Sequence, residues 1–215
     1  MKNIQAILTV ILLLLTASLI FSQQYDHEEN FNFVLIDSDK AVLITSYKGN
    51  DTVVRIPPRI KDLPVTWIGQ MAFAERGLVS LTIPDTVVMI GSRAFVSNQL
   101  TSVTIPNSVL YIGNWAFASN QLNNVTIPDS VREISVGAFS FNQLNSVNIP
   151  RGVFIGNRAF FKNNTLTSIT IGDNVTLCIT SLSFDGIFDA IYKNYHRSAG
   201  TYTRSNTFSS VWIKQ

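Results

Sequence analysis

The sequence predicts a mainly β solenoid, in which short coils of chain stack on one another, because four kinds of residue recur with a period of 22 positions. The recurring features are an Ile-Pro pair, an Ala-Phe pair, a leucine and an asparagine. The isoleucines are Ile83, Ile105, Ile127 and Ile149, the phenylalanines are Phe95, Phe117, Phe139 and Phe160, the leucines are Leu78, Leu100, Leu122, Leu144 and Leu166, and the asparagines are Asn98, Asn120, Asn142 and Asn164. A fixed period held in several columns is typical of one coil per repeat. About six coils are expected, over residues 54–184.

Each repeat contains one short strand that ends at a proline. In the repeat with Pro106, Val103 and Ile105 alternate with Ser102 and Thr104, which is typical of a half-buried strand. The proline has no N–H group, so the strand ends there. The same pattern predicts strands at 79–83, 102–105, 124–127, 146–149 and 168–171, paired in one parallel sheet.

The phenylalanine and asparagine columns have different predicted roles. The phenylalanines, with Phe73 before them and Phe184 after them, should form a buried aromatic row. A carboxamide at the same place in every coil can satisfy backbone groups of a turn that has no regular partner. Near the end of the array, Thr165 is a one-residue insertion and one residue is missing between Pro150 and Ile155. These changes offset each other, so stacking geometry is expected to set the period.

Residues 1–22 are predicted to be a secretory signal peptide. A short basic start precedes an apolar run over residues 4–21, and small or polar residues follow. Cleavage is expected after Ser22, with Ser18 as the other candidate. The alternative is a retained anchor, because 18 apolar residues nearly span a bilayer.

Two caps are expected at the ends of the solenoid, because an open last coil would expose core and strand edge. The N-terminal cap, residues 23–53, contains two strands at 33–36 and 42–45 around a turn at 37–40. Asp37 and Asp39 have calcium-loop spacing, but the further ligands of such a loop are missing, which favours a plain turn. The C-terminal cap, residues 185–215, has a short helix predicted at 188–192 and closing strands at 200–204 and 210–214.

Residues that carry chemistry are scarce. The chain has 2 histidines and 1 cysteine, and no catalytic or metal-binding set is assembled by spacing. The cysteine, Cys178, is expected to be a small buried hydrophobe. The net charge is +2 and there is no basic run, so nucleic acid is not a predicted partner. We therefore predict no enzyme activity, no cofactor and no metal.

The candidate binding residues come from two variable positions in each coil. They read Thr66-Trp67, Val88-Met89, Leu110-Tyr111, Arg132-Glu133 and Val153-Phe154. If they point outward, they form a mostly apolar ribbon, and contiguous exposed apolar surface marks a contact site. The predicted ligand-binding residues are Trp67, Met89, Leu110, Tyr111 and Phe154. The alternative is that the segment is a second strand or that its side chains turn inward.

The run from Asn98 to Val109, followed by Ile112 to Phe117, resembles the BspA-type leucine-rich repeat, and the resemblance extends from about Asn32 to the end of the chain. The ending at 199–204 is similar to the terminal cap of spirochaete repeat proteins. The resemblance implies a leucine-rich-repeat solenoid and a secreted or outer-surface protein, with the periplasm as an alternative location. It also implies a protein-binding module, such as an adhesin for host matrix or serum proteins. A structural protein of the envelope without a host ligand is the alternative, and the sequence indicates no oligomeric state.

Overall fold

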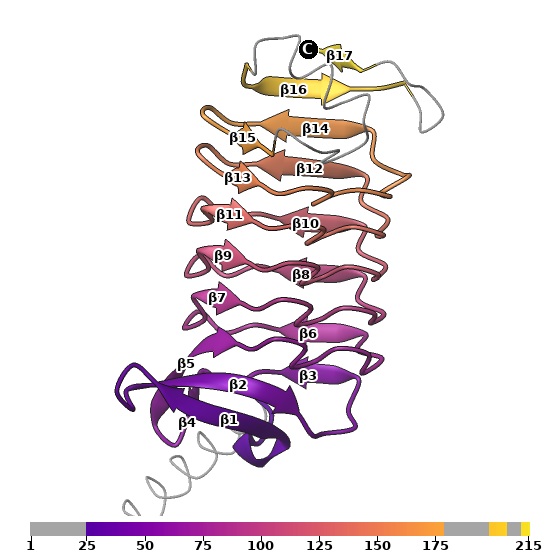
Figure 1. The fold of residues 1–215 in the computed structure, drawn as a ribbon. Helices are drawn as coiled ribbons and strands as arrows, with labels where there is room; N and C mark the ends of the chain where they lie inside the picture. Colours follow the sequence, from indigo (N-terminus) through magenta and orange to yellow (C-terminus); the bar gives the residue numbers. More distant parts are fainter. Residues whose placement is uncertain (1–24, 179–197, 206–211) are drawn as a thin grey trace, which may run out of the picture.

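The molecule is a column of stacked coils with short strands on two of its sides (Figure 1). The computed structural model describes residues 25–178, 198–205 and 212–215. The predictions for the signal peptide, for Phe184 and for a helix at 188–192 lie outside the described residues. The mainly β solenoid predicted from the 22-residue period is confirmed.

The predicted strands lie along one side of the column, but they form two sheets. Five pairings join six strands in the order β17-β16-β14-β12-β10-β8, and a separate two-stranded sheet pairs β3 with β6. The strands are β3 (Val53–Arg55), β6 (Ser80–Thr82), β8 (Ser102–Thr104), β10 (Asn124–Thr126), β12 (Ser146–Ile149), β14 (Ser168–Ile171), β16 (Gly200–Thr203) and β17 (Ile213–Lys214). The prediction of one sheet was therefore wrong between β6 and β8. The interruption falls where half-buried Leu81 replaces the buried β-branched residues of later coils, such as Val103.

A nine-stranded sheet runs along the other side of the column, formed by the segment for which a second strand was one alternative. Its order is β1-β2-β5-β7-β9-β11-β13-β15, and β4 pairs with β5. The strands are β1 (Phe31–Ile36), β2 (Ala41–Tyr47), β4 (Arg59–Ile60), β5 (Leu63–Ile68), β7 (Met89–Ile90), β9 (Tyr111–Ile112), β11 (Glu133–Ile134), β13 (Phe154–Ile155) and β15 (Thr176–Leu177). The predicted N-terminal hairpin is present as antiparallel β1 and β2, and a single 3-10 turn, η1 (Glu28–Asn30), precedes it.

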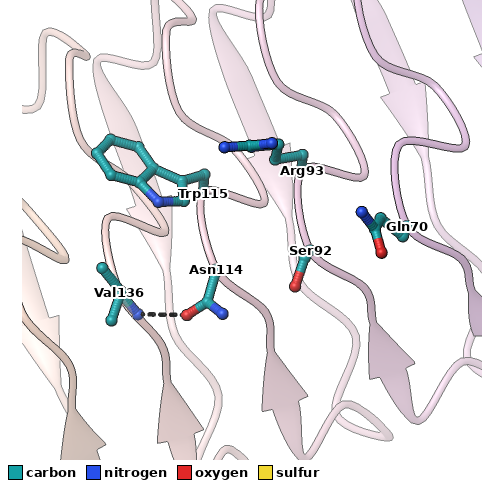
Figure 2. Close-up of a pocket in the computed structure, with 6 residues that line it drawn as sticks. All are labelled: Gln70, Ser92, Arg93, Asn114, Trp115 and Val136. Atoms are coloured by element: carbon teal, nitrogen blue, oxygen red, sulfur yellow. Dashed lines mark hydrogen bonds between the residues drawn. The ribbon is translucent and has the colours of Figure 1, made fainter.

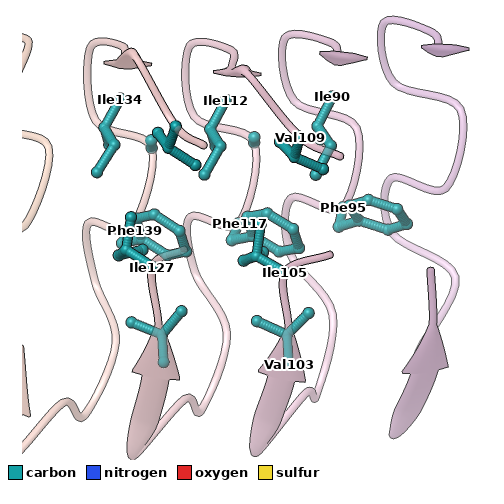
Figure 3. Close-up of a cluster of buried hydrophobic side chains, with 14 of the residues drawn as sticks. Ile90, Phe95, Val103, Ile105, Val109, Ile112, Phe117, Ile127, Ile134 and Phe139 are labelled. Atoms are coloured by element: carbon teal, nitrogen blue, oxygen red, sulfur yellow. The ribbon is translucent and has the colours of Figure 1, made fainter. Parts of the chain in front are cut away.

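The phenylalanine rings form the centre of the core, as Figure 3 shows for the middle coils. Phe73, Phe95, Phe117, Phe139 and Phe160 are all buried. Successive rings are stacked, with centroids 5.1 to 5.5 Å apart, within the range that favours aromatic pairs. Tyr47 of β2 continues the row, 5.6 Å from the first ring, and burial raises the pKa of its hydroxyl. The N-terminal hairpin therefore shares the core of the coils.

The asparagine column ties each coil to the one before it. Asn120 donates from Nδ2 to the carbonyl oxygens of Phe95 and Phe117, at 3.0 and 3.1 Å, and its Oδ1 accepts from the N–H of Leu100 at 3.1 Å. Asn98 and Asn142 make the equivalent bonds. Each buried carboxamide thus satisfies three backbone groups, the structural role that the sequence predicted.

The fourth member of this column is Asn163, so the assignment to Asn164 was wrong. Asn163 is buried and bonds the carbonyl oxygens of Phe139 and Phe160 and the N–H of Leu144, whereas Asn164 is exposed. The inserted residue therefore follows the asparagine. The Thr165 hydroxyl donates a hydrogen bond to the Leu144 carbonyl oxygen, at 2.8 Å. In earlier coils the carbonyl oxygen of the equivalent leucine accepts instead from a backbone N–H, that of Gln99, Gln121 or Gln143.

The glycine that follows the strands of the nine-stranded sheet allows close stacking. A Cβ at Gly113 would lie 2.8 Å from the backbone carbon of Gly91 in the previous coil. The glycine column thus permits close approach between the backbones of successive coils.

The last described coil ends against the closing strands. β16 pairs antiparallel with β14, and β17 pairs with β16. Arg204 donates from its backbone N–H to the Thr167 carbonyl oxygen, at 3.0 Å, and from Nε to that of Leu166, at 2.7 Å. Its guanidinium lies over the ring of Trp212, 4.9 Å from the centroid. One arginine therefore covers two backbone acceptors of the last coil.

Candidate functional site

A row of mostly apolar side chains crosses the nine-stranded sheet from one end to the other. From β2 onward, each lies just before a buried residue of its strand, so the alternation of a strand turns it outward. The pairing register places them opposite one another in the order Val34, Leu43, Trp67, Met89, Tyr111, Glu133, Phe154 and Thr176. We call the six apolar members, Val34, Leu43, Trp67, Met89, Tyr111 and Phe154, the apolar ladder.

The aromatic members of the ladder are open to solvent. Trp67 is 36%, Tyr111 41% and Phe154 41% exposed, and Val34 at the hairpin end is 48% exposed. Met89 and Leu43 are half-buried between their neighbours. Because adjacent strands lie about 4.8 Å apart, ladder side chains on neighbouring strands lie side by side.

Two residues of the variable pairs lie outside the ladder. Val153 is 0% exposed and takes the buried valine position that follows each turn, as Val131 does. The missing residue of this coil is therefore the counterpart of Arg132, and only Phe154 faces outward. Leu110 is half-buried and lies one residue before the ladder, so it is not one of its members.

The hairpin supplies two members that the sequence analysis missed. Leu43 pairs with Trp67, and Val34 pairs with Leu43, so β1 and β2 prolong the ladder beyond the repeats. The signal was present in the alternation of strand 42–45, where Leu43 lies between buried Val42 and Ile44. What the sequence could not show is the long-range pairing of β2 with β5.

One charged residue interrupts the ladder near its C-terminal end. Glu133 lies between Tyr111 and Phe154 in the register. Its Oε1 accepts a hydrogen bond from the Ser135 hydroxyl at 2.6 Å, and the residue is half-buried. The continuous apolar part of the ladder therefore runs from the hairpin to Tyr111, with Phe154 beyond the glutamate.

The opposite side of the column has a different surface. The outward positions of β6, β8, β10 and β12 are short and polar, and all of them are exposed; they are Ser80, Thr82, Ser102, Thr104, Asn124, Thr126, Ser146 and Asn148. Short polar side chains offer little area for contact. In the part of the chain that the structure describes, no three His, Cys, Asp or Glu side chains gather as a metal ion would need. The described residues also include no helix with the length and hydropathy of a membrane crossing.

Comparison with known proteins identifies the repeat. The family model described as the BspA type leucine-rich repeat region matches residues 66–188 in 6 copies, more than half of the chain. The chain belongs to the BspA-type leucine-rich repeat family. The coils, the asparagine column and the phenylalanine row are thus features of a BspA-type solenoid. No curated protein matches the chain.

Solved structures with similar repeats come from several bacteria. A leucine-rich cell surface protein from Faecalibacterium prausnitzii is 27% identical, with a TM-score of 0.40, over 68% of this chain and 54% of that one. The chain thus corresponds to about half of the length of that protein. A leucine-rich repeat protein from Bacteroides capillosus is 24% identical, with a TM-score of 0.41, over 72% of this chain and 99% of that one. The leucine-rich repeat protein of T. pallidum is 18% identical, with a TM-score of 0.40, over 79% and 95%.

Proposed function

We propose that this chain is a secreted protein-binding module of the cell surface, an adhesin or a surface interaction protein, and that it binds its protein partner on the apolar ladder. The observation that supports the proposal is the register, which gathers exposed Trp67, Tyr111 and Phe154 on one face. Contiguous exposed apolar surface marks interaction sites, and tryptophan and tyrosine are favoured anchors in protein interfaces.

The ladder is held by a rigid backbone, which favours binding. Backbone hydrogen bonds of 2.8 Å join the ends of successive strands, from Gly91 N to Ile68 O and from Gly113 N to Ile90 O. The strands are anchored from inside by buried Ile68, Ile90 and Ile112. A partner therefore meets side chains whose spacing is already fixed, which lowers the entropic cost of association.

The proposal of secretion rests on the apolar run near the start of the chain. Residues 4–21 precede Ser22, the preferred cleavage site. Surface labelling or protease treatment of intact cells tests the location. A surface protein is labelled or cut, whereas the alternative, a periplasmic or envelope protein without a host ligand, is reached only after the outer layer is opened.

A paired set of variants tests the binding face. The purified protein is measured against immobilised host matrix and serum proteins, and the ligand that binds is then titrated with Trp67→Ser/Tyr111→Ser and with the control Thr104→Ala/Thr126→Ala. Both pairs replace exposed residues, so folding is checked by thermal unfolding. An aromatic hot-spot residue contributes at least about 2 kcal/mol, so the aromatic pair should lose more than about 30-fold in affinity.

The control pair should bind like the unchanged protein. If the threonine pair loses binding and the aromatic pair retains it, the ligand is bound by the opposite sheet and the proposed site is wrong. If no ligand is captured and the protein is not reached on intact cells, the adhesin role fails and the envelope alternative stands.

A further inference from the structure

A second candidate site lies in the turns that follow β5, β7, β9 and β11. An open groove of about 300 Å³ is lined there by Gln70, Ser92, Arg93, Asn114, Trp115 and Val136. Figure 2 shows these side chains in two rows, with Arg93 and Trp115 in one and Gln70, Ser92, Asn114 and Val136 in the other. The groove lies beyond the strand ends, so its lining is separate from the apolar ladder.

The backbone conformation of the groove recurs in every coil, whereas the side chains that line it differ from coil to coil. Arg93 and Trp115 have left-handed φ values of 56° and 58°, and the equivalent residues Met71 and Arg158, at 55° and 57°, share this conformation. Strain at these positions is thus common to all coils and indicates no site. In this hollow an aromatic ring and a cation come together with Gln70, Ser92 and Asn114.

Trp115 is held in place by the next coil. A Cβ at Gly137 would lie 2.7 Å from indole atoms of Trp115, so the ring occupies the space that a side chain would fill. Gly137 itself has the left-handed φ of 64° that glycine tolerates best. The indole is therefore fixed against the backbone while the residue stays only half-buried.

The polar side chains of the groove have unused hydrogen-bonding capacity. Asn114 Oδ1 accepts from the N–H of Val136 at 3.1 Å, which fixes the carboxamide and leaves both of its Nδ2 donors without an acceptor among the described residues. The side chains of Gln70, Ser92 and Arg93 likewise form no hydrogen bond or ion pair within the described part of the chain, and no carboxylate lines the groove. An uncompensated guanidinium beside several free donors suits an anionic ligand with hydroxyl groups.

We propose that this groove binds a carboxylated sugar. The planar fork of Arg93 matches a carboxylate in two hydrogen bonds. The carboxamides of Gln70 and Asn114 and the hydroxyl of Ser92 both donate and accept, as sugar hydroxyls require. The indole of Trp115 offers an apolar face with a polar N–H, which suits the C–H face of a pyranose ring. A nucleic-acid backbone is a poorer match, since one arginine makes no basic track.

The test uses two acidic probes, trigalacturonic acid and 3′-sialyllactose, with trigalacturonate methyl ester and lactose as their neutral counterparts. Each is titrated into ¹⁵N-labelled protein, and the indole N–H signals of Trp67, Trp115 and Trp212 are followed after assignment with Trp115→Phe and Trp67→Phe. The Trp115 signal should shift and saturate with at least one acidic probe, and the Trp67 signal should stay in place. Binding of trigalacturonic acid would indicate recognition of an acidic sugar within a sugar chain, and binding of 3′-sialyllactose would indicate recognition of an acidic sugar at the end of one.

Two arginine variants provide the matched control. Arg93→Gln should weaken binding of the acidic probe by about ten-fold or more and remove the preference over its neutral counterpart, because a hydrogen bond to a charged group is lost. Arg158→Gln changes the same position in a coil outside the groove and should leave the affinity within about two-fold. The proposal is overturned if no probe shifts Trp115, if acidic and neutral probes bind equally, or if the two arginine variants behave alike. Failure of the ladder as a protein site would leave these readouts unchanged.

Discussion

The middle coils and the last described coil reach the same geometry with different residues. In the middle, the carboxamides of Asn98, Asn120 and Asn142 bond the same three backbone groups at an unbroken period of 22 residues. The last coil lacks one residue before Phe154 and has an extra one before Leu166. The backbone groups of the coil before it are nevertheless satisfied in the same places, by Asn163 and by the Thr165 hydroxyl.

This difference shows what the repeat preserves. A buried carbonyl or N–H without a partner costs about 1–3 kcal/mol, so each coil must supply a donor or acceptor at fixed points of the previous one. The chemical group that supplies it can change. The carbonyl oxygen of Leu122 accepts a hydrogen bond from a backbone N–H, that of Leu144 from a threonine hydroxyl, and that of Leu166 from an arginine side chain.

The largest effect is expected in the aromatic row, which the two regions share. Phe117→Ala should lower the free energy of unfolding by about 3–5 kcal/mol, because it leaves a cavity in a packed core. Phe160→Ala should cause a similar loss, since its ring is buried and stacked 5.5 Å from Phe139. Phe161→Ala is the control, because this neighbour is half-buried and should lose less. Urea unfolding measures all three, and a loss at Phe160 no larger than at Phe161 would show that the last coil is packed less tightly.

A smaller effect is expected from the asparagine column. Asn120→Ala leaves the buried N–H of Leu100 without its acceptor and removes one of the two asparagine donors to the carbonyl oxygens of Phe95 and Phe117, so stability should fall by about 1–3 kcal/mol. Asn163→Ala should do the same, and Asn164→Ala, at an exposed position, should change stability by less than about 0.5 kcal/mol. Thermal and denaturant unfolding distinguish the two adjacent residues. Equal effects at Asn163 and Asn164 would contradict the register described above.

The smallest effect is expected at the inserted residue. Thr165→Val keeps the shape of the side chain but removes the donor to the Leu144 carbonyl oxygen, so a loss of about 1 kcal/mol is expected. Thr167→Val serves as the comparison, because its hydroxyl is 3.4 Å from the Asn145 carbonyl oxygen at an exposed place. If Thr165→Val is as stable as Thr167→Val in denaturant unfolding, the hydroxyl does not replace the missing backbone bond.

The fold followed from the sequence because its signals are periodic. Pro106 and Pro128 mark strand ends, and Phe95 and Phe117 mark the core. Assignments failed where the period changes. Two asparagines stand side by side at 163 and 164, and counting residues cannot show which of them is buried.

In the candidate sites, too, some residues could be predicted from the sequence and others could not. Trp67, Tyr111 and Phe154 were found because large apolar residues at variable positions are conspicuous. Leu43 was missed because its place depends on a pairing between segments of different pattern. The groove at Arg93 and Trp115 was missed because it needs left-handed backbone at residues with no glycine to indicate it.

The contacts of Arg204 have a consequence for how such a molecule changes in length. Among the described coils, the closing strands pair with the last one, through Leu166, Thr167 and β14. A duplication of one 22-residue unit in the middle would present the same surfaces to both neighbours and leave each terminus with its present partner. Recombination between repeats would therefore lengthen the column in whole steps of about 4.8 Å and add one outward-facing position each time. The length of the column and the area of its contact surface would therefore both increase with the number of repeats, while the packing at the two ends stays the same.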